Sequence, residues 1–502
     1  TSWGNKGSPG TVVGQLDSEP AHVAKAVEPH RFKFWGRPTF DAVPFLDDAN
    51  QEAFLYPLDL AKAADPEAFP APRVRVRATK SQQMKLVQKL DESGRLGLLP
   101  EAQVRMAYRN GLFAIPKDEK RDRMVLDARP PNVLEDNEER WIRSLASVAQ
   151  LGHMFLQPDE ELRIFAEDLR EFYHAFLISP QPLSRNALNL SFQPWQVCKL
   201  SAFDKSLWSQ GPLVPALNTM AMGDNRAVSF GQAAHLGVLL QTGQLKLSDF
   251  LTLHARPGRG DWHAGLMIDD LVLFQRVTGR QERTACEEKI DAIRRKYDEV
   301  GLPRHEGKAV YNEPQAELWG VQLDGVSGQV RPNLKRAIPL CSLVLRLVGL
   351  GVASVGLLEI LAGSFVSIFQ LRRRHMAILE QIYAAQRGRD RRAVIALSCE
   401  LKDELLAAVA LVALTSIDMR LSPSSKLVCS DASNTAEAAV AADIPRELTA
   451  EFQRHALQKG LWARLLQPGA AYMREKSLLE EDEELPQGCY ESHPLWQEAA
   501  RT

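Results

Sequence analysis

The sequence predicts an α+β fold, and three features of its hydrophobic pattern support this prediction. Between about residues 160 and 325, short apolar stretches typical of strands alternate with helical segments. Residues 333–415 have the pattern of helices, and near residue 426 the strand pattern returns in KLVCSDAS. The chain has 502 residues, of which 45% are hydrophobic and 25% charged, as expected for a soluble globular protein of several domains.

The composition also limits the classes of function. The net charge of −2 gives no overall basic excess, so any basic cleft must be local. None of the six cysteines lies in a Cys-x-x-Cys spacing, so neither a zinc site nor a disulfide framework is expected. A reducing, intracellular location, cytoplasmic or nuclear, is the resulting expectation. The chain begins without Met and without a signal-peptide pattern, which favours a fragment or a processed piece.

One apolar run requires a comparison with membrane spans. Leu347–Leu358 is uninterrupted by charge, but a spanning helix needs about 20 predominantly apolar residues. The run is therefore predicted to belong to two buried helices, with Ser354 as the N-cap of the second. No membrane partner is expected.

The first 160 residues divide into an irregular and a regular part. Residues 1–80 are predicted to be an N-terminal extension, partly disordered because residues 1–30 are rich in Gly, Ser and Pro. A helical pattern then covers residues 81–110. The strand-like pair Phe113–Ile115 and Met124–Leu126 follows, and the charged segment between its members predicts a hairpin loop.

Three aspartates lie where strands are predicted to end. The apolar run in LRIFAEDLREFYHAFLIS (162–179) ends at Asp168, and GLMIDDLVLF (265–274) has apolar arms on both sides of Asp269 and Asp270. The second pattern predicts a hairpin with two carboxylates at its tip. Nucleotidyl transfer by two Mg²⁺ ions needs carboxylates at the ends of adjacent strands, because Mg²⁺ takes oxygen ligands. Each pattern alone is more often a plain turn or a helix N-cap.

Six motifs around these aspartates resemble those of reverse transcriptases, and they occur in that family's order. They are FAIPKDEKRDRMVLDARPPN (113–132), Asp168-Leu-Arg-Glu-Phe-Tyr173, AMGDNRAVSFGQ (221–232), Met267-Ile-Asp-Asp270, GLPRHEGKA (301–309) and Leu318-Trp-Gly320. The resemblance covers roughly residues 85–330 and is nearest to retroelements of the LTR or tyrosine-recombinase type. It departs at Met267, where the family's box has Tyr, and this puts catalytic efficiency or fidelity in doubt.

The resemblance implies a right-hand polymerase fold of fingers, palm and thumb. By this division residues 81–160 are fingers, 161–330 are palm, with 179–219 partly fingers, and 331–420 are a helical thumb or connection. Residues 421–502 then resemble a partial RNase H-like α/β domain, in which Asp431 matches the first metal ligand. The nearest later acidic residues match no motif, so no nuclease activity is expected from this chain.

The resemblance also assigns a role to each candidate residue. Asp168, Asp269 and Asp270 are catalytic and hold two Mg²⁺ ions, with Mn²⁺ as a possible substitute. Further residues would form the nucleotide site. Tyr173 would exclude a ribose 2′ hydroxyl, Gly223 would let backbone approach the substrate, and Lys308 would lie beside the pyrophosphate. The remaining assignments are Lys117 and Arg123 for the triphosphate, Arg129 for the template or the loop, and Trp319 with Gly320 for the primer grip. Surface or core roles remain open for each of these residues.

The expected function is synthesis of DNA on an RNA or DNA template, as part of a retrotransposon polyprotein. The expected partners are an RNA template, a DNA primer and dNTPs. A catalytically inactive, domesticated or decayed nucleic-acid-binding relative is the alternative, favoured by Met267 and by the incomplete C-terminal domain. A viral RNA-dependent RNA polymerase is a third reading, and Tyr173 and Asp431 argue against it.

Overall fold

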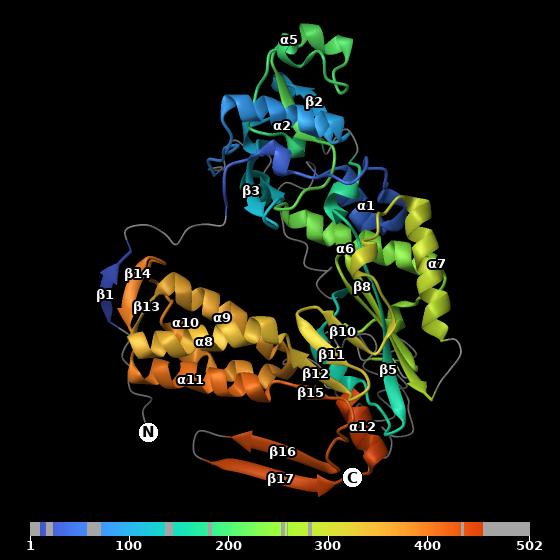
Figure 1. The fold of residues 1–502 in the computed structure, drawn as a ribbon, viewed down its shortest axis with the longest axis vertical. Helices are drawn as coiled ribbons and strands as arrows, with labels where there is room; N and C mark the ends of the chain where they lie inside the picture. The colour runs from blue at the N-terminus through green and yellow to red at the C-terminus, as the bar shows by residue number, and fades with distance from the viewer. Residues whose placement is uncertain are drawn as a thin grey trace, which may run out of the picture.

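The structure is a computed structural model, in which long helices and antiparallel sheets are mixed as the α+β prediction requires (Figure 1). It describes residues 11–16, 24–57, 72–135, 144–178, 183–252, 257–258, 260–279, 284–432 and 436–454.

A four-stranded antiparallel sheet lies at the centre of the chain, in the order β7-β8-β5-β9. Its strands are β5 (Glu160–Asp168), β7 (Trp262–Met267), β8 (Asp270–Thr278) and β9 (Val310–Glu313). The helices on it are α1 (Asp48–Leu55), α6 (Asn225–Gln241) and α7 (Ala285–Val300). Side chains from both faces of β5 and β8 are buried, which explains why these strands are apolar almost throughout.

The N-terminal half forms a second unit above this sheet in Figure 1. Its helices and strands enclose a separate apolar core. They are α2 (Lys80–Glu92), β2 (Leu96–Pro100), β3 (Gly111–Pro116), β4 (Asp122–Asp127), α3 (Arg129–Leu134), α5 (Pro194–Val197) and β6 (Leu213–Leu217). The antiparallel pairing of β3 with β4 confirms the predicted hairpin and its charged loop.

The N-terminal extension expected over residues 1–80 is corrected for residues 24–57. Phe40 and Phe54 are buried in the core beneath the central sheet, and Phe32 is buried in the core of the N-terminal unit. Lys25 pairs with Ala114 of β3 through two backbone hydrogen bonds of 2.8 and 3.1 Å. The sequence predicts no helix or strand for this segment, because its aromatic residues follow no regular period. Residues 1–10, 17–23 and 58–71 lie outside the described residues.

A second four-stranded sheet, in the order β10-β11-β12-β15, joins the central sheet to a helical bundle. Its strands are β10 (Gln315–Leu318), β11 (Val321–Asp324), β12 (Gln329–Pro332) and β15 (Ile417–Asp418). The bundle contains α8 (Leu334–Leu350), α9 (Val355–Phe369), α10 (Glu380–Ala384) and α11 (Cys399–Leu414) around one apolar core. At its far end β1 (Val12–Gln15), β13 (Val352–Ser354) and β14 (Ala393–Ala396) form a three-stranded sheet.

The apolar run in this bundle contributes to two helices as expected, but it is not buried throughout: Leu350 at the end of α8 is 73% exposed, because α8 buries one face only. The run ends α8 and begins α9, and the Ser354 side chain caps α9 by accepting a hydrogen bond from the Leu357 N–H at 3.3 Å. In the described residues, one helical stretch, Val355–Ile378, has the length and apolar composition of a membrane span. Its backbone is interrupted at Arg372, and Phe365 and Phe369 face the bundle core, so packing within the bundle explains its apolar character.

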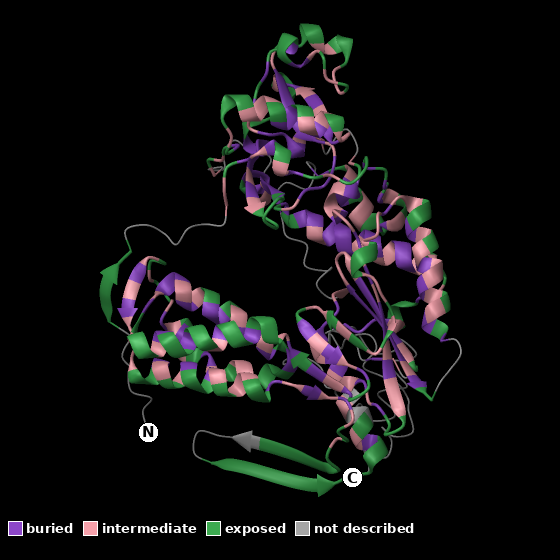
Figure 2. Ribbon diagram, in the orientation of Figure 1, coloured by how far each residue is buried: buried purple, intermediate pink, exposed green. Residues whose placement is uncertain are grey.

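The last described elements are a hairpin and a short helix. They are β16 (Lys426–Ala432), β17 (Glu437–Asp443) and α12 (Arg446–Arg454). Asp431 pairs with Ala438 in a sheet of only these two strands, and the hairpin is exposed in Figure 2. The predicted RNase H-like domain stays a prediction, because residues 455–502 lie outside the described residues.

Candidate active site

The turn between β7 and β8 carries two of the three predicted aspartates. Met267 pairs with Asp270, so Ile268 and Asp269 are the two residues of a tight turn, and the predicted hairpin is confirmed. The backbone of Ile268 has φ of +59°, a conformation that β-branched residues rarely adopt. Strain of this kind costs about 1–3 kcal/mol and persists only where surrounding contacts impose it.

Two side chains of α6 impose the strained turn. The Gln232 side-chain carbonyl accepts a hydrogen bond from the Ile268 N–H at 2.7 Å. The His235 ring donates from Nδ1 to the Ile268 carbonyl at 2.6 Å, and its Nε2 lies 2.6 Å from the hydroxyl of Tyr297 on α7. Burial lowers the pKa of His235 to about 4, so the ring is neutral and Nε2 accepts from the hydroxyl. Both polar groups of the Ile268 backbone are therefore held from one helix.

Strand register brings the third aspartate to this turn. Asp168, the last residue of β5, lies opposite Asp270 on β8, and the Leu169 N–H donates to the Asp269 carbonyl at 3.1 Å. Like charges directly opposite each other on a sheet are destabilising. Burial and the neighbouring carboxylates raise the pKa of Asp270 to about 7, and burial and Asp168 raise the pKa of Asp269. The three aspartates therefore form one half-buried, mutually repelling group.

The donor set fits a magnesium site in its chemistry, although its spacing does not form a ready cage. Three clustered carboxylates that repel one another supply the oxygen ligands that Mg²⁺ takes, and a divalent cation would relieve their repulsion. Among the described residues, however, no group of three or more His, Cys, Asp or Glu side chains is spaced to hold one metal ion. Lys308 instead forms an ion pair with Asp168. The structure thus places Lys308 on one of the three predicted aspartates, where its ammonium supplies the counter-charge.

Tyr173 lies at the edge of this group. Its ring packs against the core beneath the sheet, 5.9 Å between centroids from Phe172. Burial, followed by the nearby charges of Asp269 and Asp224, raises the pKa of the Tyr173 hydroxyl. Gly231 of α6 makes this position possible, because an added Cβ would lie 3.0 Å from the Phe172 ring and 3.2 Å from the Tyr173 ring.

Gly223 approaches protein backbone in the structure. An added Cβ would overlap the Leu126 carbonyl oxygen at the end of β4, and φ at Gly223 is +105°, which favours glycine. The Leu126 N–H donates to the Met222 carbonyl at 2.8 Å. Asn132, the last residue of the first motif, donates to the Gly223 carbonyl at 3.1 Å. Gly223 therefore joins the β3–β4 hairpin to the start of α6, and its predicted approach to substrate stays a prediction.

The cations of the β3–β4 hairpin lie on the side of the aspartates. Lys117 and Arg123 are exposed, Arg123 is close enough to Asp269 to lower its pKa, and Lys117 has the same effect on Glu171. Arg129 instead makes a bidentate ion pair with Asp127, with both N–O distances 2.7 Å. This ion pair holds the Arg129 guanidinium at the end of β4, in agreement with a role in the loop.

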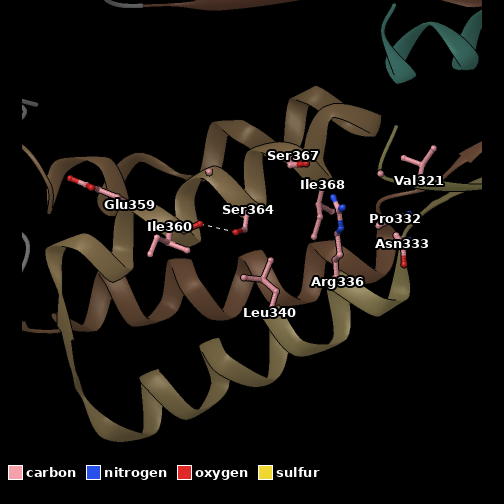
Figure 3. A pocket seen from close by; sticks show the side chains of 12 residues that line it. Val321, Pro332, Asn333, Arg336, Leu340, Glu359, Ile360, Ser364, Ser367 and Ile368 are labelled. Atoms are coloured by element: carbon pink, nitrogen blue, oxygen red, sulfur yellow. Dashed lines mark hydrogen bonds between the residues drawn. The ribbon is translucent and has the colours of Figure 1, made fainter. Parts of the chain in front are cut away.

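Trp319 and Gly320 form the two-residue turn between β10 and β11, with φ of +48° and +81°. The Trp319 ring lies against Gly265 of β7, where an added Cβ would overlap it. Beside this turn is a groove of about 550 Å³ that reaches along α8 and α9 of the bundle (Figure 3). Arg336 lies at its end near the turn, and the Ser364 hydroxyl on its wall donates to the Ile360 carbonyl at 2.7 Å.

A buried ion network supports the site and was missed from the sequence. Arg185 donates to Glu135 at 2.6 Å through both Nε and Nη2, and to Asp224 at 2.5 and 2.9 Å. Burial alone would lower the pKa of Arg185, but the two carboxylates raise it, so the guanidinium stays charged. Asp224 also caps α6 at the Arg226 N–H. No sequence signal links these residues, because each looks like an ordinary surface charge.

The structure does not bring Asp431 to the other aspartates in the described part of the chain, since β16 pairs only with β17. No protein-family model and no curated protein sequence matches the chain. Among solved structures, the chain is similar to a foamy viral protease-reverse transcriptase dRH in complex with double-stranded DNA, with 13% identity, a TM-score of 0.47, and coverage of 76% of this chain and 57% of that one.

A second structure, a foamy viral protease-reverse transcriptase in complex with double-stranded DNA, has 12% identity and a TM-score of 0.45, over 76% of this chain and 67% of that one. The chain therefore spans little more than half the length of the first of these proteins. Both likenesses are weak, so the functional assignment depends on the residues of the site.

Proposed function

We propose that the chain is an RNA-directed DNA polymerase that transfers nucleotides with two divalent metal ions, Mg²⁺ or Mn²⁺. One observation carries the proposal: β-sheet register gathers Asp168 of one motif with Asp269 and Asp270 of another at one end of the central sheet. Repulsion among the three carboxylates is a cost to folding that a role in binding cations explains. An origin in a retrotransposon polyprotein belongs to the same proposal.

The reaction requires one bond to form and one to break. The primer 3′ oxygen bonds to the α-phosphorus of the incoming dNTP, the bond from that phosphorus to its bridging oxygen breaks, and pyrophosphate leaves. The hydroxyl proton passes to solvent. When bound, the metal ions lower the pKa of the hydroxyl and neutralise charge on the phosphates. Asp168, Asp269 and Asp270 would hold them, and Lys308 must leave Asp168 for this to occur.

The other residues orient the substrates. Lys117 and Arg123 would neutralise the triphosphate as the β3–β4 loop closes. In this proposal the central sheet is the palm, the N-terminal unit the fingers and the helical bundle the thumb. The primer and template would lie along the groove beside the Trp319–Gly320 turn, with Arg336 near the phosphates.

Primer extension tests the proposal. The purified chain should extend a DNA primer on an RNA template with dNTPs in Mg²⁺ or Mn²⁺. Absence of extension in both metals, by protein shown to be folded, would remove the claim of activity.

Tyr173→Val tests the proposed choice of sugar. The shorter side chain removes the ring that would clash with a ribose 2′ hydroxyl, so incorporation of rNTPs relative to dNTPs should rise by about 10-fold or more. Phe172→Leu is a matched control that alters the adjacent ring without changing position 173. Equal selectivity in wild type and Tyr173→Val would remove Tyr173 from this role.

A second candidate is a nucleic-acid-binding protein without polymerase activity. The ion pair of Lys308 with Asp168 favours it, because this pair occupies a carboxylate that metal binding needs. Met267 in place of the family's Tyr also favours it. Template–primer binding that persists in Asp269→Asn, together with no synthesis by the parent protein, would select this candidate.

A further inference from the structure

A small pocket of about 90 Å³ lies beside the candidate active site and has no role so far. Its walls come from four separate segments: residues 35–37, the turn before β2, the residues directly after β5, and the connection after α7. Three arginines and one carboxylate line it, namely Arg37, Arg95, Arg170 and Glu171. The lining therefore carries a formal excess of positive charge.

Arg95 is a buried cation whose ion pair with Glu171 is long. Its side chain is 2% exposed, and the Glu171 oxygen is 4.0 Å from Nη2. Nη1 donates to the Gly36 and Ser93 carbonyls at 2.8 Å each and Nη2 to the Trp35 carbonyl at 3.5 Å, but Nε has no hydrogen-bond partner among the described residues. Burial lowers the pKa of Arg95. A buried charge of this kind is costly unless a counter-ion meets it.

Arg170, which lines the same pocket, also has a nitrogen without a hydrogen-bond partner in the described part of the chain. Its guanidinium lies 4.1 Å from the centre of the Trp35 ring, which fixes the plane of the group. Its Nε is also buried and lacks a hydrogen-bond partner among the residues that the structure describes. Two arginines of one pocket thus each have a buried Nε without an acceptor among the described residues, and buried N–H groups are ordinarily hydrogen-bonded.

Glu171 alone does not balance the positive charge of the pocket. One of its oxygens accepts a hydrogen bond from the Trp35 N–H at 2.7 Å, and burial raises its pKa. Its backbone is held at φ of +48°, a conformation uncommon outside glycine. One carboxylate that already accepts from Trp35 leaves the charge of the three arginines incompletely balanced.

The pocket is next to the reaction site. Arg170 and Glu171 follow Asp168 directly after Leu169, which donates to the Asp269 carbonyl. Lys117 and Arg121 of the β3–β4 loop lie close enough to Glu171 to lower its pKa. The pocket therefore adjoins the space between this loop and the aspartates, where the triphosphate is proposed to bind.

We propose that this pocket binds an inorganic phosphate anion, and that during synthesis it takes one end of the released pyrophosphate. The second half of this inference depends on the proposed function, and the first half does not. A volume of about 90 Å³ equals roughly three water molecules at about 30 Å³ each, so a phosphate group fits and a nucleoside does not. Guanidinium groups bind phosphate oxygens through paired N–H donors.

Calorimetric titration of the full chain tests the pocket without metal or nucleic acid. Orthophosphate and pyrophosphate are titrated separately in chloride buffer at constant ionic strength. Each should bind saturably to wild type, and Arg37→Gln and Arg170→Gln should each weaken binding by about 10-fold, because each removes a charged hydrogen-bond donor. Arg37 is exposed, so its substitution leaves the fold intact. Arg105→Gln, at another exposed arginine, is the matched control and should bind as wild type does.

The outcomes separate the two halves of the inference from each other and from polymerase activity. Absence of saturable binding, or equal affinities in wild type, Arg37→Gln and Arg170→Gln, would overturn the proposal that the pocket binds phosphate. Binding of orthophosphate without pyrophosphate would overturn the product role alone. Because the titration contains no primer, template or metal, phosphate binding by a protein that fails primer extension would support the pocket while the proposed function fails.

Discussion

Two β-hairpins of this chain carry aspartates predicted to bind metal ions, and the surroundings of these two hairpins differ. The β7–β8 hairpin lies inside a four-stranded sheet, and its turn is bound by Gln232 and His235. Among the described residues, the β16–β17 hairpin pairs only with itself and is exposed (Figure 2). Its Val428 and Val440 are 63% and 68% exposed. An aspartate on a strand therefore becomes part of a site only where neighbouring elements add burial and further carboxylates.

The largest expected difference is in catalysis. Asp269→Asn removes one carboxylate from the proposed metal site, so the rate of primer extension should fall by at least about 100-fold. Asp431→Asn makes the same chemical change on the exposed hairpin and should leave the rate unchanged. Similar losses in the two variants, measured by single-nucleotide incorporation, would break the comparison between the hairpins.

Acid should weaken the core around the β7–β8 hairpin. Burial lowers the pKa of His174, His235 and His263 to about 4 in each case, with the Arg95 and Arg276 charges adding to the effect at His174 and His263. These rings are neutral when folded but bind protons near pH 6.5 when unfolded. The histidine contribution to stability is therefore full above about pH 6.5 and falls as the pH drops toward 4, by up to about 1.4 kcal/mol per pH unit for each ring. Asp270, with its pKa raised to about 7, offsets the slope of one of these rings over the same range, so the net slope keeps the sign set by the three histidines.

Urea unfolding monitored at several pH values measures this slope. His235→Gln should reduce the slope by about one proton, because glutamine does not titrate. The β16–β17 hairpin contains no histidine. A stability that is flat between pH 6.5 and 5, or a slope unchanged in His235→Gln, would show that these rings are not buried as described.

Packing around the aspartate turn gives a smaller effect. Gly265→Ala should destabilise the protein by about 1–3 kcal/mol, because the new methyl group overlaps the Trp319 ring. Gly363→Ala is the matched control, since nothing lies within 4 Å of its added Cβ and alanine favours a helix. The cost of Gly265→Ala should shrink by about 1 kcal/mol in a Trp319→Phe background. An equal cost in both backgrounds contradicts the contact.

The smallest effect is expected at the exposed hairpin. Val440→Thr should change the free energy of unfolding by less than about 0.5 kcal/mol, because the side chain is 68% exposed. Val272→Thr on β8 places the same hydroxyl at a position only 2% exposed and should cost about 1–3 kcal/mol. A large effect at Val440 would show that this hairpin is covered in solution.

The sequence could predict the parts of the site that are local. The continuous apolar arms on both sides of Asp269 and Asp270 specify a hairpin, and Trp319-Gly320 is a recognisable turn. The brace from Gln232 and His235 could not be predicted, since it depends on how α6 crosses the hairpin. Arg185 and Arg95 look like surface residues in the sequence because burial of a charge leaves no local pattern.

Residues 24–57 illustrate the same limit for the fold. Their aromatic side chains are irregularly spaced, so the sequence pattern predicts no helix or strand there. Phe40 and Phe54 nevertheless complete the core beneath the aspartates. The pairing of Lys308 with Asp168 was also beyond the sequence, because the two residues lie 140 positions apart. Contacts between distant segments decide both features.

Equilibrium binding of Mn²⁺ tests most directly whether the β7–β8 hairpin forms the metal centre. Electron paramagnetic resonance would count the ions bound by the chain with a dideoxy-terminated primer, an RNA template and a dNTP. Two ions should bind to wild type and to Asp431→Asn, while Asp269→Asn should lose at least one of them. Full binding by Asp269→Asn, or an equal loss in Asp431→Asn, would contradict the assignment of the metal centre to Asp168, Asp269 and Asp270.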